Sequence, residues 1–117
     1  MKMVRSFKYA FEGIATACWT QPNFRAELIA SLLGVAAGCW LHVSSGEWLV
    51  IALNISIVLS LELVNTAIES ACDLFSKEYH PAIKFIKDIA AAAVLIAGIA
   101  AAVCGVIIFL PKIIQLF

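Results

Sequence analysis

Four polar residues interrupt an apolar stretch, and their spacing places them on one face of a helix. The stretch runs from Glu47 to Asp73, and its second half also contains Glu62, Asn65 and Glu69. At about 100° per residue, Glu62, Asn65, Glu69 and Asp73 fall within an arc of about 80°. A carboxylate at the bilayer centre costs about 2.5–3.5 kcal/mol if it faces lipid, so the shared face predicts a site. The alternative is a helix that has left the membrane by Glu62, which the apolar residues between the acids disfavour.

These residue types suit phosphoryl transfer. Carboxylates and an amide near a membrane surface can hold Mg²⁺, an ion that keeps few protein ligands and uses substrate phosphates for the rest. Lys87, next to Asp88 in a later segment, can neutralise phosphate charge. Glu62 has apolar neighbours and can serve as a general base, and the rest of such a reaction is positioning and charge stabilisation. A proton or ion pathway would use the same residues, because acids within membranes mark such pathways too.

The composition predicts an all-α integral membrane protein. The chain has 117 residues, of which 63% are hydrophobic and 14% charged, and its formal net charge is zero. Soluble domains average about 45–50% apolar residues, and a chain this short could not bury such an excess. A soluble helical bundle is therefore disfavoured, and the neutral charge balance gives no sign of nucleic-acid binding. The four cysteines stand singly, without metal-binding spacing, and are interpreted as free thiols.

The apolar pattern predicts a single membrane domain over residues 1–117, with a surface helix and three spans. Residues 1–20 have a helical period with charges off the apolar stripe, which predicts an amphipathic helix in the membrane interface. Packing against a soluble partner would give the same pattern. Helices containing the transmembrane spans are expected at residues 24–43, 47–73 and 82–110.

Prolines and glycines mark the predicted boundaries of these helices. Pro22 breaks the chain after the surface helix, Pro81 opens the last helix, and Pro111 is expected to end it. A turn is expected at residues 44–46. Gly34 and Gly38 form a small-residue pair that allows close approach of another helix.

The distribution of basic residues predicts the orientation. The chain has eight Lys and Arg residues, and the loop between the first two spans has none of them. Seven lie before the first span or between the second and third: Lys2, Arg5, Lys8, Arg25, Lys77, Lys84 and Lys87. By the positive-inside rule the N-terminus and the second loop are cytoplasmic and the C-terminus lies outside. The carboxylate face then lies toward the cytosolic interface.

The polar block resembles the prokaryotic diacylglycerol kinase family. The resemblance rests on Glu62-Leu-Val-Asn65-Thr-Ala-Ile-Glu69, on Asp73, and on the sequences Glu78-Tyr79-His80 and Lys87-Asp88 ahead of an Ala-rich span. It extends over nearly the whole chain, from about Lys2 through Pro111. It implies a homotrimer of three-span protomers in the bacterial inner membrane, with active sites between protomers. It also implies ATP-dependent phosphorylation of a lipid hydroxyl.

The resemblance also implies roles for individual residues. Glu62 corresponds to the proton acceptor, which also contacts the lipid substrate, and Asn65 to the catalytic asparagine that orients the phosphates. Glu69 corresponds to the glutamate that binds magnesium and nucleotide. The further nucleotide contacts would be Tyr9, Glu78, Tyr79, His80, Lys87 and Asp88. Arg25 and Trp40 correspond to lipid-substrate positions. From residue type alone, His80 would be a helix-start residue and Trp40 an interfacial anchor.

Two departures from the family pattern affect the expected site. Gln21 stands where the family usually has a second metal-binding glutamate, so magnesium affinity or geometry is in question; Glu12 or Glu27 are candidates to compensate. Lys2 stands where an arginine is expected, which keeps the charge but loses the bidentate fork.

The acceptor lipid is left open between two alternatives. Diacylglycerol, giving phosphatidic acid, is favoured by Cys39-Trp40-Leu41 and Glu78-Tyr79-His80. Undecaprenol is suggested by His80-Pro81 and by the setting Leu61-Glu62-Leu63. A non-enzymatic membrane subunit or an ion pathway is the further alternative, in which Gln21 has removed metal binding.

Overall fold

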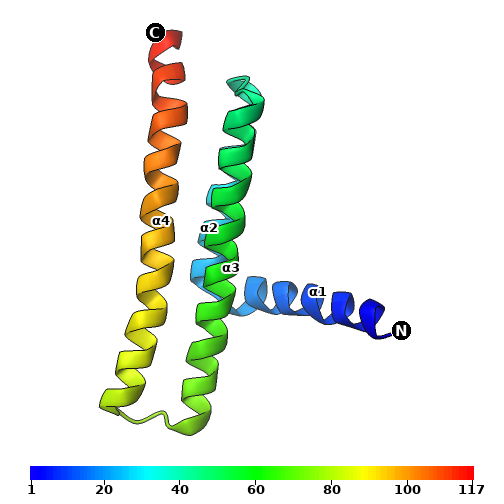
Figure 1. Cartoon of the computed structure of the whole chain (residues 1–117), viewed down its shortest axis with the longest axis vertical. Helices are drawn as coiled ribbons and strands as arrows, with labels where there is room; N and C mark the ends of the chain where they lie inside the picture. Colours follow the sequence, from blue (N-terminus) through cyan, green and yellow to red (C-terminus); the bar gives the residue numbers. More distant parts are fainter.

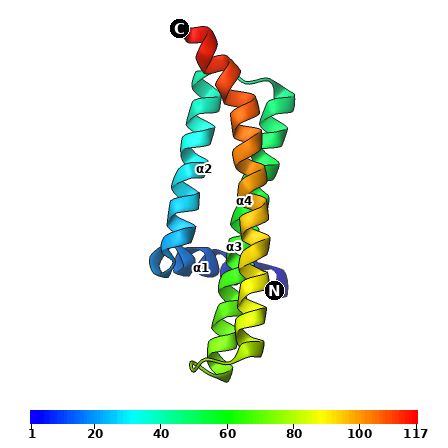
Figure 2. The same ribbon diagram turned by 90° about the vertical axis from the view of Figure 1, so that its left-hand side faces the viewer.

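The protein folds into four helices and no strands, as the composition predicts. The computed structural model describes all 117 residues. The helices are α1 (Lys2–Thr20), α2 (Pro22–Trp40), α3 (Ser45–Phe75) and α4 (Pro81–Leu116). Helices α2, α3 and α4 run side by side, and α1 leaves sideways from the start of α2 (Figure 1). The second view shows α2 standing apart from the more closely packed α3–α4 pair (Figure 2).

Two helices, α3 and α4, are long and apolar enough to cross a membrane. Helix α2 is not among them, because Asn23, Arg25 and Glu27 occupy its first two turns and lower its hydropathy. The third span therefore stays a prediction. Buried residues number 11 of 117, and α3 and α4 expose many large apolar side chains. Apolar surface of that extent marks contact with lipid or with other chains.

Helix α2 ends at Trp40, three residues before the predicted end at Val43. The Val43 N–H donates to the Gly38 carbonyl at 3.2 Å, and His42 between them has a φ of 53°. This is the Schellman arrangement, in which the residue after the C-cap adopts the left-handed conformation. The prediction was wrong here because that position is most often glycine, and histidine gives no such signal in the sequence.

Helix α3 begins at Ser45, so the turn expected at residues 44–46 lies earlier. Ser44 is the N-cap: its Oγ accepts the Glu47 N–H at 3.2 Å, and Glu47 Oε1 accepts the Ser44 N–H at 2.9 Å. This reciprocal capping box satisfies two donors at the start of the helix. Glu47 also forms an ion pair with Lys112 of α4, with 3.1 Å between Oε1 and Nζ.

Helix α4 continues through Pro111 to Leu116, which corrects the prediction that Pro111 ends it. Proline removes one backbone hydrogen bond, and membrane helices tolerate that loss when neighbouring groups hold the segment. Here the Lys112–Glu47 ion pair ties this last part of α4 to α3. Phe109 also packs against the small cluster formed by Val43, Ile51 and Ile108.

Of the two glycines predicted to allow close helix packing, Gly38 lies against another helix and Gly34 does not. A Cβ on Gly38 would lie 2.6 Å from the Trp48 ring, whereas a Cβ on Gly34 would meet nothing within 4 Å. Gly38 therefore lets α2 approach the start of α3. Gly34 instead lines a mostly apolar cavity between α2, α3 and α4.

Helix α1 lies beside α3 at the height of residues 63–67. A groove between α1 and α3 is lined on the α3 side by Leu63, Thr66 and Ala67. Helices α3 and α4 continue past α1 to their connection (Figure 1).

Arg25 stabilises the junction between α1 and α2, because its Nη1 donates to the carbonyls of Cys18 at 3.0 Å and Trp19 at 3.1 Å. If α1 lies in the membrane interface, Glu62 is near that interface and the rest of α3 extends beyond it.

Candidate functional site

The polar face of α3 points into the bundle. Glu62 is 4% exposed and Asn65 is 8% exposed, although both stand among apolar residues. The Asn65 Nδ2 donates to Glu69 Oε1 at 3.2 Å, one turn further along the helix. Glu69 is half-buried and lies close enough to Glu62 to act on it electrostatically. The acids and the amide that the spacing places on one face therefore do form one continuous polar strip.

Helix α2 adds an acid to this strip. Glu27 lies on the inner face of α2, together with Phe24, Leu28 and Ser31. Its carboxyl group is close enough to the Glu62 carboxyl to act on it electrostatically across the α2–α3 contact. The sequence suggests Glu27 as a substitute metal ligand. The spacing of 24, 27, 28 and 31 was the signal that could have placed it inside.

Two ion pairs lie beyond the buried acids, at the end of α3 and the start of α4. Lys87 Nζ is 2.8 Å from Asp73 Oδ1, which links the two helices. Lys84 Nζ is 2.5 Å from Asp88 Oδ2, one turn along α4. The residues of both pairs are at least partly exposed, so neither contributes much to stability. Lys87 therefore lies at the same end of the bundle as the acids, and its charge is accessible to an anionic ligand.

The strip contains atoms that suit a magnesium ion. Asn65 Oδ1 is buried and has no hydrogen-bond partner, and the Glu69 carboxylate adjoins the same side chain. Carbonyl and carboxylate oxygens are the ligands that Mg²⁺ prefers. No group of three or more His, Cys, Asp or Glu residues is placed to hold a metal. Asn65 and Glu69 thus fit an ion that takes its remaining ligands from phosphates or another chain.

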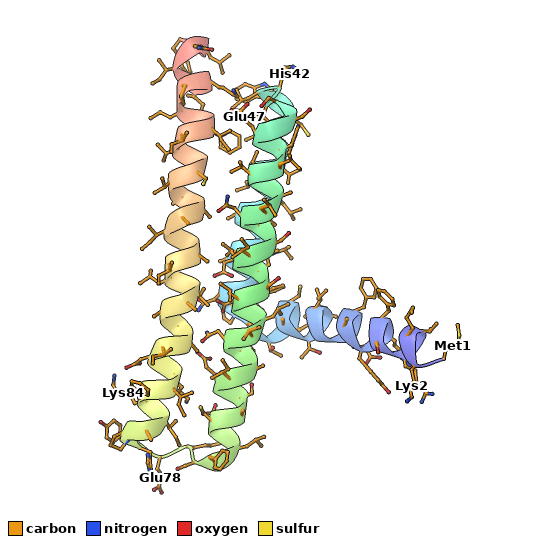
Figure 3. All side chains as sticks on the ribbon, in the orientation of Figure 1. Met1, Lys2, His42, Glu47, Glu78 and Lys84 are labelled. Atoms are coloured by element: carbon orange, nitrogen blue, oxygen red, sulfur yellow. The ribbon has the colours of Figure 1, made fainter.

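The predicted nucleotide contacts outside this strip are exposed in the single chain, except for Lys87, which is half-buried. Tyr9 lies on α1, and Glu78 and Tyr79 lie in the connection between α3 and α4. Figure 3 shows Glu78 at the end of the bundle with Lys84, opposite the end that carries Glu47. His80 is the N-cap of α4, where its Nδ1 accepts the Ala82 N–H at 3.2 Å, as its residue type alone suggests. Nucleotide binding by these residues stays a prediction.

The predicted lipid contacts are separated along the bundle. Trp40 is 69% exposed at the far end of α2, away from the acids. Arg25 is engaged with the carbonyl groups of α1. Gln21, which replaces the expected second metal ligand, is the C-cap of α1, and its Nε2 donates to Thr20 Oγ1 at 3.2 Å. The roles predicted for these three residues are not tested by the geometry of one chain.

Comparison with known proteins identifies the family. Residues 8–109 match the family described as prokaryotic diacylglycerol kinase. A diacylglycerol kinase of Synechocystis is 41% identical over 112 residues, covering 95% of this chain and 64% of that protein. The chain thus spans less than two thirds of the length of that relative.

Two further relatives have been given different substrate names. The undecaprenol kinase of Bacillus subtilis is 38% identical over 111 residues, covering 95% of this chain and 90% of that protein. The diacylglycerol kinase of Escherichia coli K12 is 33% identical over 102 residues, covering 87% and 84%. With a family match over most of its length and a buried carboxylate–amide strip in an all-helical fold, the chain belongs to the prokaryotic diacylglycerol kinase family.

Proposed function

We propose that the protein is an ATP-dependent lipid kinase that phosphorylates the hydroxyl group of diacylglycerol, giving phosphatidic acid, at the cytosolic membrane interface. The observation that carries this proposal is the buried polar strip of Glu62, Asn65 and Glu69, with Lys87 at the same end of the bundle. Acidic residues in a membrane helix are costly when they face lipid. Those that occur usually face the interior of the bundle and mark a functional site. Family membership supplies the reaction class.

In the proposed reaction, Glu62 accepts the proton of the lipid hydroxyl. The hydroxyl oxygen forms a bond to the terminal phosphorus of ATP as the bond to the bridging oxygen breaks, and ADP leaves. Magnesium held by Asn65 Oδ1 and Glu69 would neutralise phosphate charge. The Lys87 ammonium group adds a positive charge for the nucleotide, in exchange for its pairing with Asp73. Glu62 is more deeply buried than Glu69, which suits a base that meets its substrate from the membrane.

The proposed assembly is a homotrimer in the bacterial inner membrane, with three spans per protomer and the N-terminus in the cytoplasm. One chain leaves large apolar side chains exposed along α3 and α4. Within that chain Trp40 lies far from the acids, and Tyr9 lies on α1. An active site between protomers would allow residues separated in one chain to come from two chains.

Undecaprenol is the second candidate acceptor. The relative named undecaprenol kinase is matched over 90% of its length, whereas the Synechocystis diacylglycerol kinase is matched over 64%. Both alternatives place a hydroxyl group at Glu62 and differ in the hydrocarbon that carries it.

The test is a lipid-panel assay. Purified protein in mixed micelles receives Mg-ATP with diacylglycerol, undecaprenol or a simple fatty alcohol, and phosphate transfer to each lipid is measured. We expect transfer to diacylglycerol in the wild type. Glu62→Gln should lower kcat by about 10²–10⁴-fold, the usual contribution of a general base, with unchanged helical content. Absence of transfer to every lipid alcohol by a folded protein would contradict the proposal, and transfer to undecaprenol alone would replace the acceptor.

A further inference from the structure

A cavity of about 350 Å³ lies between α2, α3 and α4, and the proposed reaction assigns it no role. Of its 16 lining residues, 10 are hydrophobic and three are glycines: Gly34, Gly98 and Gly105. Ser31 and Asn54 also line it, but their side chains donate to carbonyl groups of their own helices. A cavity with such a lining excludes water and accepts apolar ligands.

The three glycines keep this cavity open. A Cβ added at Gly34, Gly98 or Gly105 would meet nothing within 4 Å, whereas a Cβ at Gly38 would collide with Trp48. Helix packing within the chain therefore does not require the three glycines, although glycine in a helix interior is destabilising relative to alanine. Larger side chains at these positions would fill the cavity.

The dimensions of the cavity fit one hydrocarbon chain. Its lining on α4 extends from Gly98 to Phe109, which is about 16 Å at a rise of 1.5 Å per residue. Dividing the volume of about 350 Å³ by that length gives a cross-section of about 22 Å². The width is then about 4–5 Å, close to the distance at which carbon atoms pack. A helix of a second copy is too large, because one turn about 10 Å across already fills about 400 Å³.

One end of the cavity adjoins the buried acids, and the other end is closed. Val58 lines the cavity, and Glu62 follows it by four residues on the same face of α3. Glu27 lines the cavity as well, and its Oε2 is buried without a hydrogen-bond partner. At the opposite end, Phe109 packs against the buried cluster that contains Ile108. The cavity therefore leads from the proposed proton acceptor into the apolar part of the bundle.

We propose that this cavity holds a hydrocarbon chain of the lipid acceptor, and that Phe109 limits the length of chain that it encloses. The inference rests on the proposed function, because it places the acceptor hydroxyl at Glu62. A zigzag of carbon–carbon bonds of about 1.5 Å spans the cavity with about 12 carbons. The chain enters between α2 and α4, which contact one another less than either contacts α3. The second chain of a diacyl lipid stays in the bilayer.

Photocrosslinking tests the location of the chain without any assay of activity. Protein in lipid vesicles is illuminated with hexadecanol that carries a diazirine about ten carbons from its hydroxyl, and the adducts are mapped by mass spectrometry. We expect adducts near Cys104 and Phe109 that unlabelled hexadecanol removes by competition. Gly98→Leu should lose most of them, whereas the control Ala100→Leu, exposed on α4 and outside the lining, should retain them. Adducts confined to exposed residues such as Ile99 would overturn the proposal, and a neighbouring chain in the cavity would give this result.

The dependence of phosphate transfer on chain length tests the limit at Phe109. In the wild type, kcat/KM for straight-chain alcohols should rise with length, because each enclosed carbon adds packing contacts, and level off near about 12 carbons. Gly98→Leu should move this plateau to shorter chains and Phe109→Ala to longer ones, while Ala100→Leu keeps the wild-type profile. Unchanged profiles in both cavity variants would refute the limit. An inactive wild type that still gives competed adducts in the cavity would instead refute the proposed function and leave the hydrocarbon site established.

Discussion

At the scale of single residues, burial distinguishes the acids of this chain from one another. Glu62 and Asn65 are almost fully buried, whereas Asp73 and Asp88 are exposed and pair with lysines. The spacing in the sequence predicts the shared face, because helical periodicity is a local property. It does not predict that Glu27 lies near Glu62, because that depends on how α2 packs against α3.

Gln21 is one of the two residues at which the sequence departs from the expected family pattern. It carries a neutral amide where a second metal-binding carboxylate is expected, and its side chain donates a hydrogen bond to Thr20 Oγ1. We expect Gln21→Glu to lower the magnesium concentration that gives half-maximal activity by about tenfold, because a carboxylate binds this hard cation more strongly than an amide does. The measurement is phosphate transfer at varied free Mg²⁺. Gln21→Asn serves as the neutral control, and an unchanged magnesium dependence in Gln21→Glu would place this position outside the metal site.

At the scale of helices, the interiors follow the apolar pattern and the ends depend on single contacts. Helix α2 stops early because His42 adopts a left-handed conformation. Helix α4 passes Pro111, and the next residue, Lys112, forms an ion pair with Glu47 of α3. A capping box at Ser44 sets the start of α3. Each of these features depends on a contact between particular residues or on an unusual backbone conformation. Hydropathy alone does not reveal either.

The left-handed conformation of His42 gives a test of the α2 terminus. Histidine is enriched at positive φ compared with most residues, whereas a β-branched residue there is a strained outlier, and the left-handed conformation costs about 1–2 kcal/mol for a residue that does not tolerate it. We therefore expect His42→Val to lower the free energy of unfolding by about 1–2 kcal/mol. The control His42→Gly removes the same imidazole but fits positive φ, and it should not be destabilising. Thermal unfolding in detergent, followed by circular dichroism, compares the three proteins. Equal destabilisation by both substitutions would show that the imidazole itself stabilises the turn.

At the scale of the whole molecule, the two ends of the bundle differ in chemistry. One end carries His42 and Glu47, and the other carries Glu78 and Lys84 (Figure 3). The polar strip and the Asp73–Lys87 pair belong to the second end. Helix α1 joins the bundle partway along, so the ends of α3 and α4 project past it (Figure 1). This arrangement suits the proposed function, in which the lipid comes from the membrane and the nucleotide from the cytosol.

The predicted orientation can be measured by cysteine labelling. In a variant whose four native cysteines are replaced, Ser45→Cys should react with a membrane-impermeant maleimide in intact cells. Lys77→Cys should react only after permeabilisation, because seven of the eight basic residues lie on its side of the membrane. Both positions are exposed in the structure, so burial would not explain a difference. The reverse labelling pattern would place the polar strip outside the cell and contradict ATP use.

The sequence by itself determined the helical class, the apolar segments of α3 and α4, and the polar face of Glu62, Asn65 and Glu69. Each of these follows from composition or from the 3.6-residue period, which depend on residues close together in the chain. The tertiary structure decided the proximity of Glu27 to Glu62, the Asp73–Lys87 link and the level at which α1 crosses α3. These depend on packing between helices, where a contact joins residues that no local pattern connects.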